Sequence, residues 1–76
     1  MSHLTGKTVA FLMTDGFEDA EFTEPWKAVT EHGAQAVLVS PKAGELTGEK
    51  GHTQRVDRQV ADAVPEQFDA LVLPGG

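Results

Sequence analysis

Glu18 is the strongest candidate for a chemical role, because it follows an apolar run and stands near the expected start of a helix. A carboxyl group in that place, when partly buried, can stay protonated and donate a hydrogen bond, or can act as a general acid or base. The same position suits a plain carboxylate that stabilises the positive end of the helix dipole. The position of Glu18, taken alone, favours the role of stabilising the helix dipole.

Gly75 and Gly76 are the second candidate, and they follow Pro74 after another apolar run. Glycine lets backbone N–H groups approach a ligand closely, as an oxyanion or phosphate site requires. A Pro-Gly-Gly turn alone usually does no more than reverse the chain. Ligands of open α/β sheets bind beyond the carboxyl ends of the strands, so Glu18 and the two glycines are predicted to meet at one edge.

Composition excludes several kinds of site. The 76 residues include 12 acidic and 6 basic side chains, a formal charge of -6, which argues against nucleic acid and a polybasic membrane contact. Without cysteine, the sequence has no disulfide, thiolate zinc ligand or thiol nucleophile. The histidines are far apart in sequence and form no metal motif, so neither a metal nor a cofactor is expected. They are His3, His32 and His52.

The sequence also lacks the features of a membrane or secreted protein. No apolar run approaches the roughly 18 residues that a membrane span needs. Residues 1–7 lack the apolar segment of a signal peptide. A soluble, cytoplasmic protein with no membrane partner is therefore expected.

Three apolar runs without polar alternation predict buried parallel strands. They are residues 9–13, 36–39 and 70–73. A helix with one apolar stripe is predicted between the first two, ending before Gly33. The stripe consists of Phe22, Trp26 and Val29, which are expected to be core rather than a dimer contact. The helix begins either after a Thr23 cap, with Pro25 in its first turn, or near Asp19, with Pro25 inside it.

The segment between residues 42 and 62 is polar, and its glycines are spaced like turns. Weak alternation at 46–47 and 54–56 predicts a small polar hairpin on the surface rather than in the core. A short helical turn is predicted over 62–67. The charged side chains of this region are expected to be a solvated surface, and they are Lys50, Arg55, Asp57 and Arg58.

Four segments in order resemble the DJ-1/PfpI superfamily, and in particular its PfpI branch of intracellular proteases and general stress proteins. They are residues 15–25, 33–37, 48–51 and 68–76. The resemblance implies a class I glutamine amidotransferase-like protein with a flavodoxin-like three-layer α/β sandwich, a parallel central sheet and a small hairpin. Residues 1–76 would be the N-terminal portion of a single domain, ending before the nucleophile elbow.

The resemblance also implies a site. A cysteine nucleophile, usually followed by histidine, would hydrogen-bond to Glu18, and the amides of Gly75 and Gly76 would help to form the oxyanion site. That nucleophile would lie beyond Gly76, so the chain is expected to be inactive alone. The full-length protein would be a protease, glyoxalase or deglycase. Its partners would be a small carbonyl compound or a peptide or protein, and it would assemble as a homo-oligomer.

Two other hypotheses for the function stay open. One helix covers only one face of the predicted sheet, so a partner chain or a missing part of the domain must cover the other. A stand-alone, non-catalytic α/β module that binds a partner through that face is the alternative to a fragment. A receiver-like phosphoacceptor domain would use Asp15 in a metal cluster, but the third apolar run ends in Leu73 and Pro74 rather than in an acceptor aspartate.

Overall fold

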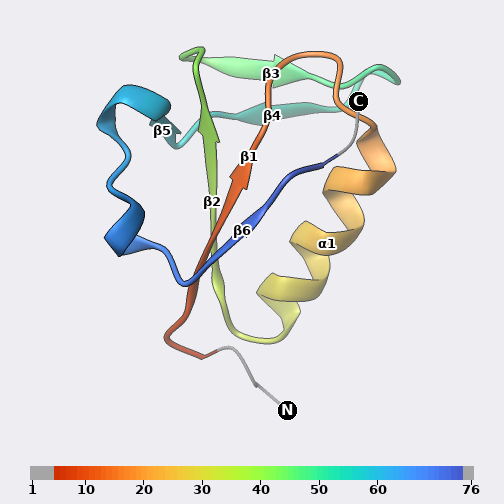
Figure 1. Cartoon of the computed structure of the whole chain (residues 1–76). Coiled ribbons are helices and arrows are strands. Elements are labelled where there is room, and N and C mark those ends of the chain that lie inside the picture. The colour runs from red at the N-terminus through yellow and green to blue at the C-terminus, as the bar shows by residue number, and fades with distance from the viewer. Residues whose placement is uncertain (1–4, 75–76) are drawn as a thin grey trace.

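A parallel sheet with one helix on one face and a hairpin beyond its carboxyl edge forms the fold (Figure 1). The computed structural model describes residues 5–74, so His3, Gly75 and Gly76 lie outside the described residues. The elements in chain order are β1 (Thr8–Leu12), α1 (Asp19–Glu31), β2 (Gln35–Ser40), β3 (Glu45–Thr47), β4 (Thr53–Arg55), β5 (Arg58–Gln59), η1 (Val60–Asp62), η2 (Pro65–Gln67) and β6 (Ala70–Val72).

The main sheet has the strand order β5-β2-β1-β6, and every pair in it is parallel. This confirms the predicted α/β fold with a parallel central sheet and all three predicted strands. The two-residue strand β5 was not predicted, because Arg58 and Gln59 carry no apolar pattern. It pairs with the end of β2 through Val39 and Ser40.

Asp69 and Asp57 each attach a neighbouring segment to the sheet through a reciprocal pair of hydrogen bonds. The Asp69 N–H donates to the Thr8 carbonyl at 2.8 Å, and the Thr8 N–H donates to Asp69 Oδ2 at 2.8 Å. Asp57 and Leu38 make the equivalent pair, with distances of 2.9 and 2.7 Å. Asp57 is exposed, as predicted for the polar region, but its carboxylate also satisfies the amide of a fully buried residue.

Helix α1 begins at Asp19 and carries Pro25 inside it, so the earlier of the two predicted starts is correct and the Thr23 cap is wrong. Glu18 is the N-cap residue, with extended backbone angles, and the Phe22 N–H donates to its carbonyl at 3.1 Å. At the other end, Gly33 has a φ of 94°, which only glycine adopts readily, and its N–H donates to Thr30. The predicted helix end is therefore confirmed.

The main core lies between α1 and the sheet. Phe11 of β1 packs against Phe22 and Trp26 of α1, with ring centroids 5.7 and 5.1 Å apart. Val29 packs against the same cluster, so the predicted apolar stripe of α1 is core. Edge-to-face and tilted ring pairs of this kind add stabilisation beyond simple burial.

The predicted hairpin is present, because β3 pairs with β4 in antiparallel register. Its placement wholly outside the core was wrong, however. Leu46 is fully buried and belongs to the main core cluster. The alternation of a strand directs this one side chain inward and its neighbours outward, so a polar hairpin still contributes a core residue.

The opposite face of the sheet is covered only in part. Residues 60–68, which form the two short turns η1 and η2 where one helical turn was predicted, place Ala63 and Phe68 against the cluster of Ala10, Val37 and Val39. A groove of about 410 Å³ remains beside them, lined among others by Leu12 and Leu71.

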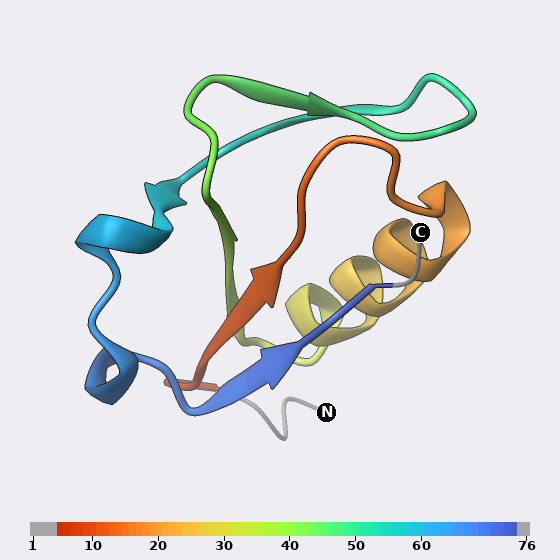
Figure 2. The same cartoon turned by 45° about the horizontal axis from the view of Figure 1, so that its top comes forward.

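Burial of the third predicted strand was wrong for this chain. Leu71 is 59% exposed and Leu73 is 67% exposed. The reason is that β6 stands at the edge of the sheet and pairs only with β1 among the described strands, as Figure 2 shows. The described residues therefore bury only part of the apolar surface of β6.

Candidate functional site

Glu18 lies where the predictions placed it, in the loop that leads from the carboxyl end of β1 into α1. Glu18 is half-buried, and its side chain makes no capping hydrogen bond to the helix. The Glu18 carboxyl therefore does not satisfy a free N–H group in the first turn of α1. We call residues 14–18 the site loop.

The β3–β4 hairpin lies across the site loop (Figure 2). The Gly16 N–H donates to the Thr47 carbonyl at 2.8 Å, and the Glu49 N–H donates to the Phe17 carbonyl at 3.0 Å. Backbone bonds on both sides of the loop therefore fix its path directly before Glu18.

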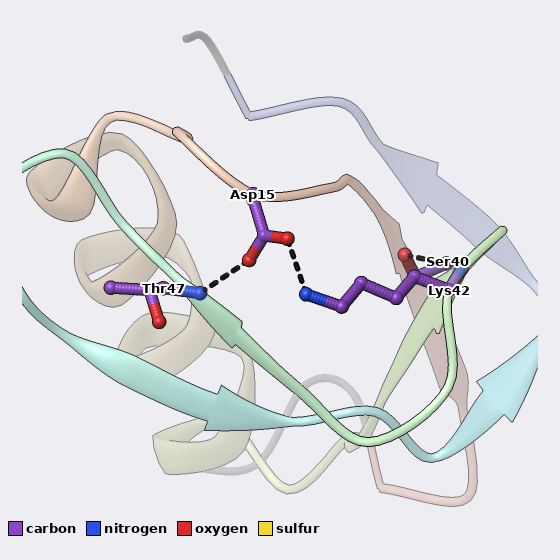
Figure 3. Close-up of polar contacts among 4 residues, drawn as sticks. All are labelled: Asp15, Ser40, Lys42 and Thr47. Carbon is purple, nitrogen blue, oxygen red and sulfur yellow. Dashed lines mark hydrogen bonds and ion pairs between the residues drawn. The ribbon is translucent and has the colours of Figure 1, made fainter.

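Asp15 joins the site loop to two further segments (Figure 3). Its Oδ2 is 2.6 Å from Lys42 Nζ, and its Oδ1 accepts the Thr47 N–H at 2.8 Å. The Lys42 hydrogen bond and then the Thr47 amide hold the pKa of Asp15 below its usual value. Sequence reasoning missed Lys42, which follows β2; buried Ser40 accepts its backbone N–H at 3.2 Å.

Asp19 holds the tip of the hairpin from the helix side. Its two carboxylate oxygens accept the N–H groups of Lys50, at 3.1 Å, and His52, at 2.9 Å. Desolvation pushes the pKa of Asp19 upward, but these two hydrogen bonds outweigh it and the net shift is downward. A carboxylate that accepts two backbone donors is thus kept ionised beside Glu18.

Gly48 makes this close approach possible. It is buried, and a side-chain carbon built on it would meet the Asp19 carboxylate and would lie 2.8 Å from the Phe17 ring. Glycine is therefore required here for space.

Glu49, at the tip of the hairpin, brings a second carboxyl to the site. A hydrogen bond with the Glu18 carboxyl, the charge of Glu18 and desolvation raise the pKa of Glu49 above its ordinary value. Sequence reasoning placed Glu49 within a family-like segment but gave it no role, because 31 positions separate it from Glu18 and no local pattern links them.

The remaining site candidates fall partly outside the described residues. β6 runs parallel to β1, so the chain reaches Pro74 toward the same edge of the sheet as the site loop. Gly75 and Gly76 themselves lie outside the described residues. Across residues 5–74, no three His, Cys, Asp or Glu side chains are grouped as metal ligands would be. Nor does any helix in that range have the length and apolar character to cross a membrane.

Comparison with known proteins gives one consistent family. The sequence model of the DJ-1/PfpI family matches residues 7–76. Among curated proteins, the chain is 44% identical over 71 residues to YraA of Bacillus subtilis, a protein named provisionally as a cysteine protease. It is 43% identical over 68 residues to deglycase TK1284 of Thermococcus kodakarensis. These alignments cover 92% and 90% of this chain but only 42% and 41% of the two relatives.

A solved structure shows the same fold. The ThiJ/PfpI domain protein from Brachyspira murdochii matches with a TM-score of 0.87 and 27% sequence identity, over 93% of this chain and 43% of that one. The present chain therefore spans about two fifths of the length of the proteins that it matches.

Proposed function

This chain belongs to the DJ-1/PfpI family, and from that premise we propose that it is the N-terminal portion of a single PfpI-type domain with cysteine-dependent hydrolase activity. Relatives whose names include a cysteine protease and a deglycase support the reaction class. The coverage of 41% and 42% of those relatives supports the assignment to part of a domain. The substrate would be a peptide or protein, or a small carbonyl compound, met in the cytoplasm.

The observation that carries the proposal is the position of Glu18. Its carboxyl stands at the carboxyl edge of the parallel sheet, half-buried and not used as a helix cap. In the proposed domain it hydrogen-bonds a cysteine supplied by residues that follow this chain. A hydrogen-bond partner of that kind stabilises the thiolate, which is the reactive form of cysteine.

Gly75 and Gly76 are proposed to supply backbone N–H groups to the oxyanion that develops during attack on the substrate. Glycine suits this role because it allows close approach of the backbone. The chain by itself has no cysteine, so it is proposed to be inactive until the rest of the domain completes the site.

The first experiment reads the genomic DNA beyond the codon of Gly76. An open frame that encodes a strand followed by Cys-His at a tight turn is expected, and a stop codon there would contradict the proposal. The protein from that frame is then assayed with methylglyoxal and with a peptide substrate. Glu18→Gln is expected to lower turnover by about 10² or more, whereas Glu24→Gln, an exposed carboxyl of α1, leaves it unchanged.

The 76-residue chain serves as its own control. It should consume neither substrate above background, because a nucleophile is missing from its sequence. Turnover by the purified chain would show that the chemistry does not need a cysteine.

A second candidate function rests on the exposed apolar side chains of the incompletely covered sheet face. They include Leu71 and Val60, which line the groove on that face. A stand-alone module would bury them against a second copy of the chain or another partner, since contiguous apolar surface of this kind marks interfaces. Light scattering distinguishes the two: a stable folded oligomer with a cooperative melt supports the module, and a monomer counts against it.

A further inference from the structure

Both neighbours of Glu18 in the chain are bonded to the tip of the β3–β4 hairpin. Before Glu18, the Phe17 carbonyl accepts the Glu49 N–H at 3.0 Å. After Glu18, the Asp19 carboxylate accepts two backbone N–H groups of the same tip, at 3.1 and 2.9 Å. The tip therefore meets the chain on either side of Glu18, beside the start of α1 (Figure 2).

The backbone of Glu18 is itself held by the core and by the helix. Phe17 is buried, and its ring packs against Phe22 with centroids 5.4 Å apart. The carbonyl of Glu18 accepts the Phe22 N–H at 3.1 Å, within the first turn of α1. The core and the helix thus fix where the Glu18 backbone lies, and the Asp19 carboxylate fixes where the hairpin lies relative to it.

The Asp19 carboxylate uses both of its oxygens in this attachment. Oδ1 accepts the Lys50 N–H and Oδ2 accepts the His52 N–H. A carboxylate offers two acceptor oxygens at a fixed separation, and hydrogen bonds to an ionised acceptor are stronger than those between neutral groups. The attachment therefore depends on the length of the side chain as well as on its charge.

Gly48 shows how closely the tip packs on this carboxylate. Gly48 is buried, and its N–H donates to the His52 carbonyl at 2.7 Å. A side-chain carbon at Gly48 would collide with the Asp19 carboxylate. A longer acidic side chain at position 19 would have to displace the tip, whereas one of equal length would fit.

An acidic residue in the first turn of a helix has a simpler role, which is to stabilise the helix dipole. That role needs a negative charge but no particular partner, whereas the bonds to the tip need an acceptor oxygen at a defined place. Asp19→Glu keeps the charge and lengthens the side chain. Asp19→Asn keeps the length and one acceptor oxygen but removes the charge. The two roles therefore predict opposite orders for these variants.

We propose that Asp19 is a positioning residue for Glu18: its carboxylate holds the hairpin tip against the chain on either side of Glu18, and so keeps the Glu18 carboxyl at the carboxyl edge of the sheet. The bearing of Asp19 on catalysis rests on the proposed hydrolase function. The attachment of the hairpin is a property of the 76-residue chain and does not depend on that function.

The test is amide hydrogen exchange of the 76-residue chain, read by NMR at the Glu49 N–H. Asp19 does not accept this hydrogen, so its exchange reports whether the hairpin stays on the loop. The Glu49 rate is divided by that of the β1 amides, because β1 is paired on both sides and reports global unfolding. Asp19→Ala is expected to raise this ratio about tenfold or more, because hydrogen bonds to a charged group are lost. Asp19→Glu should raise it as much, and Asp19→Asn should raise it less.

Asp57→Ala is the matched control, since it removes a carboxylate that accepts a backbone N–H elsewhere on the sheet. It is expected to leave the ratio unchanged. An unchanged ratio in Asp19→Ala would overturn the proposal, and so would a Glu49 amide that is unprotected in the parent. A parent-like Asp19→Glu, with Asp19→Asn exchanging like Asp19→Ala, would assign Asp19 to the helix dipole instead.

The same variants are then assayed in the longer protein encoded by the open frame beyond Gly76. Asp19→Ala is expected to lower kcat about tenfold, because Glu18 would be misplaced, and to leave KM within about twofold. Asp19→Asn should recover part of kcat. The exchange measurement involves no turnover. An inactive longer protein with Asp19-dependent exchange would refute only the proposed function, and an active one whose exchange ignores Asp19 would refute only this inference.

Discussion

The carboxylate of Asp19, in the first turn of α1, accepts the backbone N–H of His52 at 2.9 Å, across 33 positions of sequence. Through this bond a helix start holds the tip of a hairpin that would otherwise be a polar surface loop. The hairpin in turn covers the site loop and brings Glu49 to Glu18. The site is thus assembled from two segments, and several measurements can test how closely they depend on each other.

Gly48→Ala should destabilise the protein by about 1–3 kcal/mol, because the added methyl group has no space beside Phe17 and Asp19. Urea unfolding followed by Trp26 fluorescence measures the loss. Thr53→Ala, an exposed position on the same hairpin, is the control and should change stability by no more than about 0.5 kcal/mol. Equal effects of the two substitutions would mean that the hairpin does not pack against the site loop.

Asp15→Asn should make the folding stability of the protein less sensitive to acid. The pKa of Asp15 is lowered from 3.8 in the folded state, so its contribution is complete well above pH 3.8 and is lost as pH falls below that value. The parent should therefore lose more stability than the variant between about pH 5 and pH 2. Urea midpoints at a series of pH values measure this, with Glu24→Gln as a control, and identical curves would contradict the ion pair with Lys42.

Asp57→Ala should cost about 1–3 kcal/mol, because it leaves the amide of fully buried Leu38 without its acceptor. Asp57→Asn keeps an oxygen that can accept the same bond and should cost less. Asp62→Ala, at an exposed position in η1, is the matched control. Equal stability of the alanine and asparagine variants in urea would argue against this hydrogen bond.

Phe22→Ala and Leu71→Ala should differ sharply in their effects. Phe22 is fully buried between the sheet and α1, so its truncation should cost about 3–5 kcal/mol. Leu71 is mostly exposed, and its truncation should stay within about 0.5 kcal/mol. Denaturation at two protein concentrations measures both. A large, concentration-dependent cost at Leu71 would show that a second copy covers β6.

The fold was largely predictable because its signals are local. Runs of apolar residues predicted β1, β2 and β6, and the spacing of Phe22, Trp26 and Val29 predicted the face of α1 that packs on the sheet. The start of the helix was ambiguous, since Thr23 is a good cap and Pro25 disfavours an interior position. The hydrogen bonding of the first turn to Glu18 places the start at Asp19.

Half of the candidate site was predictable for the same reason. Glu18 could be found because it follows a strand and precedes a helix, and its family-like neighbours are contiguous in sequence. Glu49, Asp19 as a hairpin anchor and Lys42 as the partner of Asp15 could not be found this way. Each acts through a contact between segments about 30 positions apart, which leaves no periodic pattern in either segment.

The order of apolar and polar residues by itself determined a parallel α/β fold and the place of Glu18, because strand and helix preferences depend on short stretches of chain. The family was indicated by four short segments that resemble its members. Only the tertiary structure decided that Leu46 is core, that Leu71 is exposed, and that the hairpin tip carries a second carboxyl to Glu18. Burial and contacts between side chains depend on which surfaces meet in space. That is set by packing between distant segments rather than by the residues on either side.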